Sequence, residues 1–456
     1  MNSLERRSVS ALALVYAMRM LGLFMVMPVF VLLGDDLQGA TPALIGFAIG
    51  AYGLSQALLQ IPFGLLSDRI GRKRMIYAGL ILFAAGSLVA ASTDSIYVVI
   101  AGRILQGAGA IASVLMALLS DLTREEERTK AMATVGISIG LSFSVSLVLG
   151  PLVGSAFGLS GLFYLTALLA VIAMVVVWRL VPTPHQHKIS ADTHPARKML
   201  ATVLSDRRLL RLDFGIFALH LALTAIFLVF PSLLQNQLGL PSASHWWFYL
   251  TVMVTSFFAM IPFIIMGEKM RKMKPVLCGA IILLTLSTMG LANVSESLIA
   301  GWCVLFFFFM AFNLLEASLP SLISKEAPAA SKGTAMGVYS TSQFLGAFVG
   351  GAAGGLLLGT VGVSGVLWLM AGVLALWFVV ALTMPAPGYT TSFVVQLKEV
   401  AQSQFDSIDE ALMAMPGVQD VVILEDAGTA YLKVDRQKFD KGLLADFPFV
   451  RQGNNS

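Results

Sequence analysis

Charged residues are scarce in this sequence. Asp, Glu, Lys and Arg make up 12% of its 456 residues, whereas hydrophobic residues make up 57%. The mean hydropathy is +0.82. An ordinary soluble domain carries about 25% charged residues, so this composition excludes that class and indicates a membrane protein.

Cysteine is nearly absent as well. Cys278 and Cys303 are the only two, and both fall inside long apolar stretches with no spacing typical of a disulfide or a metal site. We also find no nucleophile–base set, no nucleotide-binding loop and no metal-ligand cluster. We therefore expect that the chain is not an enzyme, has no catalytic residues and binds no cofactor or metal.

Long apolar stretches dominate what is present. A helix needs about 20 apolar residues to cross a hydrocarbon core of roughly 30 Å. Twelve stretches meet that length, near residues 9–34, 42–66, 74–93, 95–120, 130–157, 160–181, 212–238, 245–267, 274–293, 296–323, 333–358 and 363–384. The sequence thus predicts an all-α membrane protein of twelve transmembrane helices.

The positions of the basic residues predict the orientation. Of the 30 Lys and Arg residues, only Arg19 and Arg103 lie inside a predicted span. The others lie at the N-terminus, in the tail, or in the alternate loops 68–74, 121–130, 179–211, 268–274 and 325–332. Basic loops stay on the cytoplasmic side, so we expect a multi-pass membrane protein with both termini cytoplasmic. This distribution explains the positive net charge, and we expect no nucleic-acid partner.

The chain repeats itself at an offset of about 200 residues. Leu118-Leu119-Ser120-Asp121 near the end of the fourth span has a counterpart in Leu319-Pro320-Ser321-Leu322 near the end of the tenth. Such a repeat predicts two six-helix halves in the same orientation, residues 1–181 and 212–384, joined by a cytoplasmic linker at 182–211. The linker holds His185, His187 and His194, for which a solvated loop is favoured over a metal site.

Four ionisable residues lie deep in the predicted spans: Arg19, Arg103, His220 and Glu316. Such residues are costly in lipid and usually face a cavity or a partner. They occupy the first helix of each consecutive triplet, so two facing halves would place them around one polar cavity. Gln56, Asn313 and Gln343 are further polar candidates for it. The alternative is a set of structural interhelical pairs.

Glu316 is the leading candidate for a proton-coupling site, because it is the only acid deep in a span and a carboxyl group exchanges its proton as its surroundings change. A protonated Glu316 that only bonds a neighbouring helix is the alternative. His220 is a second candidate, since histidine titrates near neutral pH, with a satisfied core histidine as its alternative. Arg19 keeps its proton, so it pairs with an acid or holds an anionic substrate.

The charged connection after the second stretch carries the most specific pattern. Its residues Gly64, Asp68, Arg69, Gly71, Arg72 and Lys73 match every defining position of the signature loop of the major facilitator superfamily, which this chain resembles. Simple anchoring by basic residues would explain the cations but not the glycines or Asp68. In that family the loop latches the outward-open state, with its Asp at the N-terminus of helix 11. The resemblance implies that Asp68 meets the segment beginning at Gly333, and we include Asp121 in the latch.

Two further motifs resemble that family. Arg103, followed by Gln106-Gly107-Ala108-Gly109-Ala110, is similar to its helix-4 motif, which implies a role for Arg103 in proton coupling. Gly150, Pro151 and Gly154 resemble the helix-5 motif of antiporters. That match is incomplete, because Ser155 replaces a final glycine and Ser146 or Val145 stands at the upstream glycine position.

After Pro385 the composition changes to that of a soluble domain. Alternating and capping patterns predict β-α-β-β-α-β, a ferredoxin-like domain at 391–453 after a short linker at 385–390. Its first loop, 398–406, lacks the paired cysteines of heavy-metal-associated domains, so copper carriage is not expected. A transporter with such a tail is similar to the YajR-like inner-membrane transporters of bacteria.

The tail is acidic, with six Lys/Arg against ten Asp/Glu in residues 389–456. We expect it to contact the basic cytoplasmic loops of its own chain and to regulate transport; a passive appendage is the alternative. The sequence as a whole predicts a monomeric, proton-coupled exporter of small molecules. A proton-coupled uptake symporter and, from another class, a membrane sensor that signals through its tail are the alternatives.

Overall fold

The structure is a computed structural model that describes residues 1–124, 127–183, 196–294, 296–328, 332–385, 390–397, 405–424, 429–435, 438–440, 442–445, 447 and 449. Within these residues, ten helical stretches are long and apolar enough to cross a membrane. The three linker histidines and most of the tail loop 398–406 lie outside the described residues.

The helices begin and end within a few residues of the predicted spans. In the first half they are α1 (Ser3–Phe24), α2 (Met27–Gly34), α3 (Pro42–Ile70), α4 (Arg72–Ala91), α5 (Ile96–Ala108), α6 (Ala112–Asp121) and α7 (Arg128–Leu180). After α8 (Ala196–Ser205), the second half holds α9 (Arg207–Asn236), the short turn η2 (Ser242–Ser244), α10 (His245–Glu268), α11 (Met273–Ala292), α12 (Leu298–Glu326) and α13 (Lys332–Leu382).

Two of these helices are far longer than predicted. α7 has 53 residues and α13 has 51, and each replaces two predicted helices. The chain passes through Gly158 (φ 66°, ψ −168°) and Gly362 (φ 69°, ψ −174°) with a backbone conformation that is open almost only to glycine. The expected twelve separate helices therefore appear as ten candidate spans, because a single glycine stands where the sequence predicts a connection.

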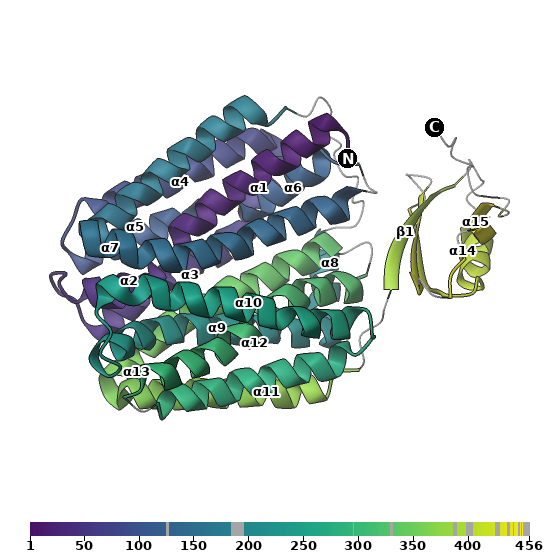
Figure 1. The fold of residues 1–456 in the computed structure, drawn as a ribbon. Helices are drawn as coiled ribbons and strands as arrows, with labels where there is room; N and C mark the ends of the chain where they lie inside the picture. Colours follow the sequence, from purple (N-terminus) through teal and green to yellow (C-terminus); the bar gives the residue numbers. More distant parts are fainter. Residues whose placement is uncertain are drawn as a thin grey trace.

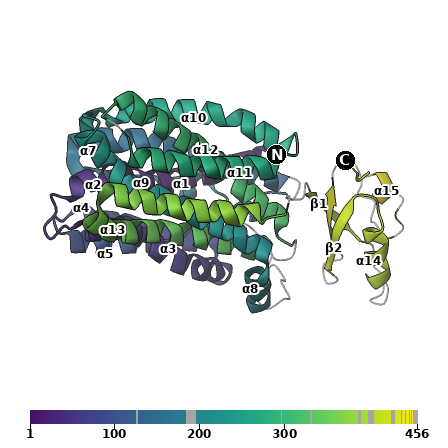
Figure 2. The ribbon, with the colours of Figure 1, turned by 90° about the horizontal axis from the view of Figure 1, so that it is seen from below.

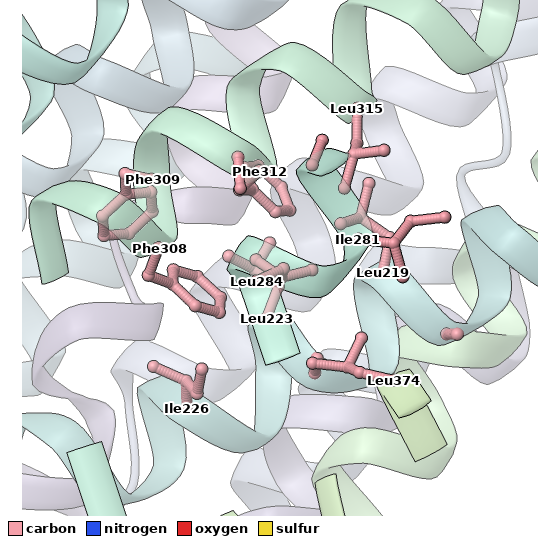
Figure 3. Close-up of a cluster of buried hydrophobic side chains, with 14 of the residues drawn as sticks. Leu219, Leu223, Ile226, Ile281, Leu284, Phe308, Phe309, Phe312, Leu315 and Leu374 are labelled. Carbon is pink, nitrogen blue, oxygen red and sulfur yellow. The ribbon is translucent and has the colours of Figure 1, made fainter. Parts of the chain in front are cut away.

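The helices form two groups, α1–α7 and α8–α13, which lie side by side (Figure 1). A large buried cluster fills the second group. The side chains of this cluster that Figure 3 labels come from α9, α11, α12 and α13, and include Leu219, Leu223, Ile281, Phe308 and Leu374. Lipid is as apolar as these side chains, so close van der Waals packing holds the helices together rather than exclusion from water.

Glycines allow the two halves to touch. A Cβ atom on Gly46 of α3 would lie 2.2 Å from the carbonyl oxygen of Gly351 on α13, and one on Gly50 would lie 2.6 Å from that of Phe348. Rings add to this interface: Phe143 of α7 lies 6.3 Å from Phe227 of α9 between ring centroids. These glycines lie in the first part of α3, away from the charged loop that follows its end. The described contacts between halves are thus concentrated away from the basic loops.

The tail contains β1 (Thr390–Gln396), α14 (Phe405–Met413), β2 (Val418–Leu424), β3 (Thr429–Asp435) and α15 (Gly442–Ala445). Its sheet has the order β1-β3-β2, and β3 is antiparallel to both neighbours. Ile408 and Leu412 of α14 pack with Leu432 and Val434 of β3 in a small core. Figures 1 and 2 place this domain beyond the end of the bundle where the N-terminus lies. The predicted last strand lies outside the described residues.

Candidate functional site

Arg103 is held entirely inside the first half. The break between α5 and α6 leaves it on α5, 1% exposed, where its guanidinium donates to the carbonyl oxygens of Ala48 (3.3 Å) and Ile49 (3.4 Å) on α3. It also donates to Oε1 of Gln106 at 2.9 Å, and the Gln106 amide donates to the Ser87 hydroxyl at 2.8 Å. This network joins three helices through one cation.

Arg19 on α1 lies near the same ring, that of Tyr52, as Arg103 does. Its Nη2 donates to Oε1 of Gln56 and, at 2.9 Å, to the carbonyl oxygen of Gly109, which also accepts a hydrogen bond from the Ile111 amide between α5 and α6. The guanidinium groups of Arg19 and Arg103 lie 5.8 Å and 5.3 Å from the ring centroid of Tyr52. Within the described residues no carboxylate pairs with either arginine, so carbonyls, amides and a ring face stabilise two buried cations.

The second half builds a separate cluster from Glu316 of α12, His220 of α9 and Gln343 of α13. The Gln343 amide lies 2.8 Å from Nε2 of His220 and donates to Oε1 of Glu316 at 3.3 Å. Oε2 of Glu316 lies 3.8 Å from Nε2 of His220, and the Glu316 side chain is 32% exposed against 8% for His220. The amide donates to both partners when His220 is neutral, with its proton on Nδ1.

The four ionisable residues expected around one cavity are therefore found in two clusters. Between them, Tyr52 of the first half packs against Phe344 of the second, with ring centroids 6.3 Å apart. Asn313 lies near Glu316 on α12 but donates to the Ser256 hydroxyl of α10, at 3.4 Å. Only the Glu316 cluster presents an ionisable side chain with substantial exposure.

Sequence reasoning missed a further acid next to this cluster. Asp213 of α9 is 4% exposed, and neither of its carboxylate oxygens has a hydrogen-bond partner within the described residues. Tyr339 of α13, also buried and without a partner for its hydroxyl there, lies within electrostatic range of both Asp213 and Glu316. Asp213 stands one residue inside the predicted span and seven residues before His220. This spacing puts both side chains on one helix face, so the sequence does contain a signal that could have identified Asp213.

The signature loop is ordered by contacts within the first half. Arg72 forms an ion pair with Asp68 and a second, at 3.2 Å, with Asp121 of α6. Gly71 adopts φ 106° where α3 gives way to α4, a conformation that favours glycine. Within the described residues, the expected contact of Asp68 with the segment beginning at Gly333 is not found: the Asp68 side chain is 54% exposed, and nothing lies within 4 Å of a Cβ placed on Gly333. The halves are apart here, so the acid pairs within its own half.

The helix-5 motif, Gly150, Pro151 and Gly154, lies at a close helix contact inside the first half. A Cβ on Gly150 would lie 2.4 Å from the carbonyl oxygen of Met25 and 2.9 Å from Pro28, and one on Gly154 would lie 3.3 Å from Leu33. Small residues beside Pro151 thus let α7 approach the start of α2.

The loop after α10 contacts the tail. Arg271 has φ 56°, unusual for a residue other than glycine, and its guanidinium bonds both carboxylate oxygens of Asp435 at 2.8 and 3.3 Å. Asp435 ends β3. A bidentate arginine–carboxylate pair of this kind restricts the relative orientation of the two side chains in addition to pairing their charges.

The family model of the Major Facilitator Superfamily matches residues 12–351. This chain belongs to the major facilitator superfamily. Its members are transporters and not enzymes, so the chain is a multi-pass transport protein of a bacterial inner membrane.

The relatives agree with that membership. The chain is 46% identical over 434 residues to the "Inner membrane transport protein YajR" of Escherichia coli (strain K12), covering 94% of each chain. It is 28% identical over 380 residues to the "Multidrug resistance protein MdtH" of Aeromonas salmonicida (strain A449), covering 79% of this chain and 94% of that one. The crystal structure of a D-xylose–proton symporter has the same fold, with a TM-score of 0.70 at 14% identity, over 84% of this chain and 99% of that one.

Proposed function

We propose that this superfamily member exports small molecules in exchange for protons, by alternating access between its two halves. The observation that carries this proposal is the Glu316 cluster. One carboxyl group, partly exposed and in reach of His220 and Gln343, is placed to bind and release a proton as the cavity around it opens and closes. The similarity to MdtH, a multidrug resistance protein, supports export of small molecules.

The topology that we propose has twelve crossings with both termini in the cytoplasm. As one straight helix, 53 residues would extend about 80 Å, more than twice a hydrocarbon core of roughly 30 Å. We infer that α7 and α13 each cross twice and turn at Gly158 and Gly362. The confinement of Lys and Arg to one set of loops supports the orientation.

The contacts between halves support a cytoplasm-facing state. α3 and α13 touch through Gly46 and Gly351, while the signature loop stays within its own half. In the opposite state we expect the glycine contacts to separate and Asp68, freed from part of its pairing with Arg72, to meet the N-terminal end of α13, where the helix dipole favours a carboxylate. Gly64, Arg69 and Lys73 complete the latch.

The first experiment uses energised inside-out vesicles, a pH-sensitive dye and a panel of lipophilic and anionic compounds. For the wild type we expect an added compound to release protons from the lumen. For Glu316→Gln, which keeps the shape of the side chain but has no exchangeable proton, we expect the initial rate to fall at least tenfold. Glu268→Gln is the matched control, because Glu268 is an acid of the same half that pairs with Lys325 away from the cluster.

Three outcomes separate the candidates. Proton release by Glu316→Gln at the wild-type rate removes Glu316 as the carrier, and His220→Gln is then tested in its place. Proton release that requires the compound inside the lumen supports the uptake symporter, for which Arg19, with Nε and Nη1 unpartnered in the described residues, is the candidate anion ligand. Silence across the panel in the wild type, with a tail that captures a partner, supports the sensor.

The tail is proposed to be ferredoxin-like and regulatory. Two strands, β1 and β2, flank an antiparallel β3, and a helix follows β1, as in a split β-α-β unit. The pair between Arg271 and Asp435 supports a regulatory contact, because it joins the acidic domain to a loop between two proposed spans. We further propose that the protein is a monomer, that its transport cycle is coupled to protons without a cofactor, and that its substrate is a small molecule.

A further inference from the structure

A groove of about 390 Å³ lies on the surface of the second half, between the start of α9 and the last turns of α13. It is lined by Arg207, Leu210, Arg211, Phe214, Leu376 and Val380. It is distinct from the Glu316 cluster and from the loop that meets the tail. Its two arginines stand together, and every other lining residue is apolar.

The two arginines are available for an external ligand. Arg207 and Arg211 are four residues apart on α9, so they share a helix face. Arg207 is exposed and Arg211 half-buried, and within the described residues neither makes an ion pair or a hydrogen bond. The intervening Arg208 differs, because it lies 3.7 Å from Glu326 of α12 in an ion pair.

The groove changes character with depth. Arg207 is the first residue of a candidate span, Arg211 lies about 6 Å further along the helix, and Phe214 about 10 Å. On the facing wall, Leu376 is 56% exposed and stands six residues before the end of α13. The groove is therefore cationic at the membrane boundary and apolar at the depth of the lipid acyl chains.

We propose that this groove binds one anionic phospholipid of the surrounding leaflet. The lipid phosphate lies between the guanidinium groups of Arg207 and Arg211, and an acyl chain runs along Phe214 and Leu376. The charge of the mouth selects an anionic headgroup, and basic pockets between membrane helices are suited to such lipids. This inference rests on the membrane crossing of α9 and α13 and not on the transported solute.

The test is native mass spectrometry of the purified full chain, titrated with phosphatidylglycerol or phosphatidylcholine in detergent. We expect one phosphatidylglycerol to bind in preference to phosphatidylcholine. Arg207→Gln and Arg211→Gln should each weaken that site about fivefold, since one basic residue near a membrane surface contributes roughly this factor. Arg208→Gln, which removes the same charge from the same turn, should stay within about twofold of the wild type.

A second variant keeps both cations. Leu376→Trp fills the apolar wall, and we expect it to lose the tightly bound phosphatidylglycerol while its size-exclusion profile stays that of the wild type. Retention of that lipid by Leu376→Trp overturns the acyl-chain site. Equal binding of phosphatidylcholine, or equal weakening by Arg208→Gln, overturns the headgroup site. Displacement of the lipid by millimolar sodium phosphate shows a site for free anions instead.

Discussion

Buried ionisable side chains in this protein differ in how their charge is accommodated. Arg19 and Arg103 are each 1% exposed, and carbonyl groups, glutamines and the ring of Tyr52 surround them. Glu316 has one amide donor and partial exposure. Asp213 has neither. The arginines are built into the first half, whereas the acids of the second half can change their protonation without breaking a network.

Asp213 gives a prediction about stability. A carboxyl group away from water, with no cation and no hydrogen bond, is stable in its neutral form, because a buried unpaired charge costs far more than a buried neutral group. Asp213→Asn should therefore leave the Tm within about 2 °C of the wild type, in contrast to the several degrees typical of breaking a buried ion pair. Thermal unfolding of the purified protein measures this.

The comparison for Asp213→Asn is Glu5→Gln. Glu5 is also buried, but it accepts hydrogen bonds from Arg124 and Asn2, so its loss should lower the Tm. A Tm for Asp213→Asn as low as that of Glu5→Gln would show that Asp213 is ionised and paired.

Helices in this fold approach each other where glycines allow it. Gly46 and Gly50 of α3 face backbone of α13, Gly150 of α7 faces α2, and Gly346 and Gly350 of α13 face α9. Other glycines, such as Gly136 of α7, would direct a Cβ into open space. Some glycines along these helices are therefore packed against backbone and others are not, and of the packed ones named here Gly46 and Gly50 lie between the halves.

Substitution of Gly46 by alanine should impair the cytoplasm-facing state. Its Cβ would lie 2.2 Å from the Gly351 carbonyl oxygen and would force α3 and α13 apart. We expect transport in vesicles to fall at least tenfold while the protein still reaches the membrane. Gly136→Ala is the control and should keep wild-type transport, with stability raised by about 0.5–1 kcal/mol from its better helix propensity. Equal transport by the two variants would contradict a role for this glycine contact.

Helix positions could be predicted from the sequence because apolar length alone limits them. The signature loop was equally clear, since Gly71 needs its positive φ and Arg72 its acids. The grouping of the buried polar residues could not be predicted, because it depends on side-chain reach: Arg19 extends to the carbonyl oxygen of Gly109 within its own half. Asp213 is not recognised from the sequence because it lies at the edge of the predicted span. The connections at Gly158 and Gly362 could be located but their one-residue form could not, because an apolar run continues on both sides of each glycine.

At the scale of the whole molecule, two helical groups and a tail domain share one chain. The halves are held together by contacts away from the basic loops, and the tail is joined to the second half by Arg271 and Asp435. Arg271 holds a left-handed backbone conformation at the turn before α11, whereas Gly71 makes the turn before α4. The two turns therefore differ in one respect: the residue with positive φ at the turn before α11 is an arginine, and its side chain makes the contact with the tail.

We expect substitutions of Arg271 and of Asp435 to have different effects on stability. Arg271→Gly removes the ion pair but suits the positive φ, so we expect faster protease release of the tail with a Tm of the helical part close to the wild type. Asp435→Asn removes the pair and leaves the left-handed arginine, so it should release the tail equally and lower the Tm further, by about 1–3 °C. Lys269→Gln, which removes an exposed charge from the same loop, is the control for both. Wild-type protease resistance in both variants would show that the pair does not hold the tail.

In the proposed topology, Gly158 and Gly362 lie on the non-cytoplasmic side of the membrane, where each reverses the chain with one residue and no loop. Neither turn would then offer a segment that an antibody could bind, a protease could cut or an inserted epitope could occupy. Gly239 is different: it lies in the connection between α9 and η2, has φ 69°, and has open space around a Cβ. In that topology, a tag that is to be detected from the non-cytoplasmic side of the membrane therefore belongs at residue 239.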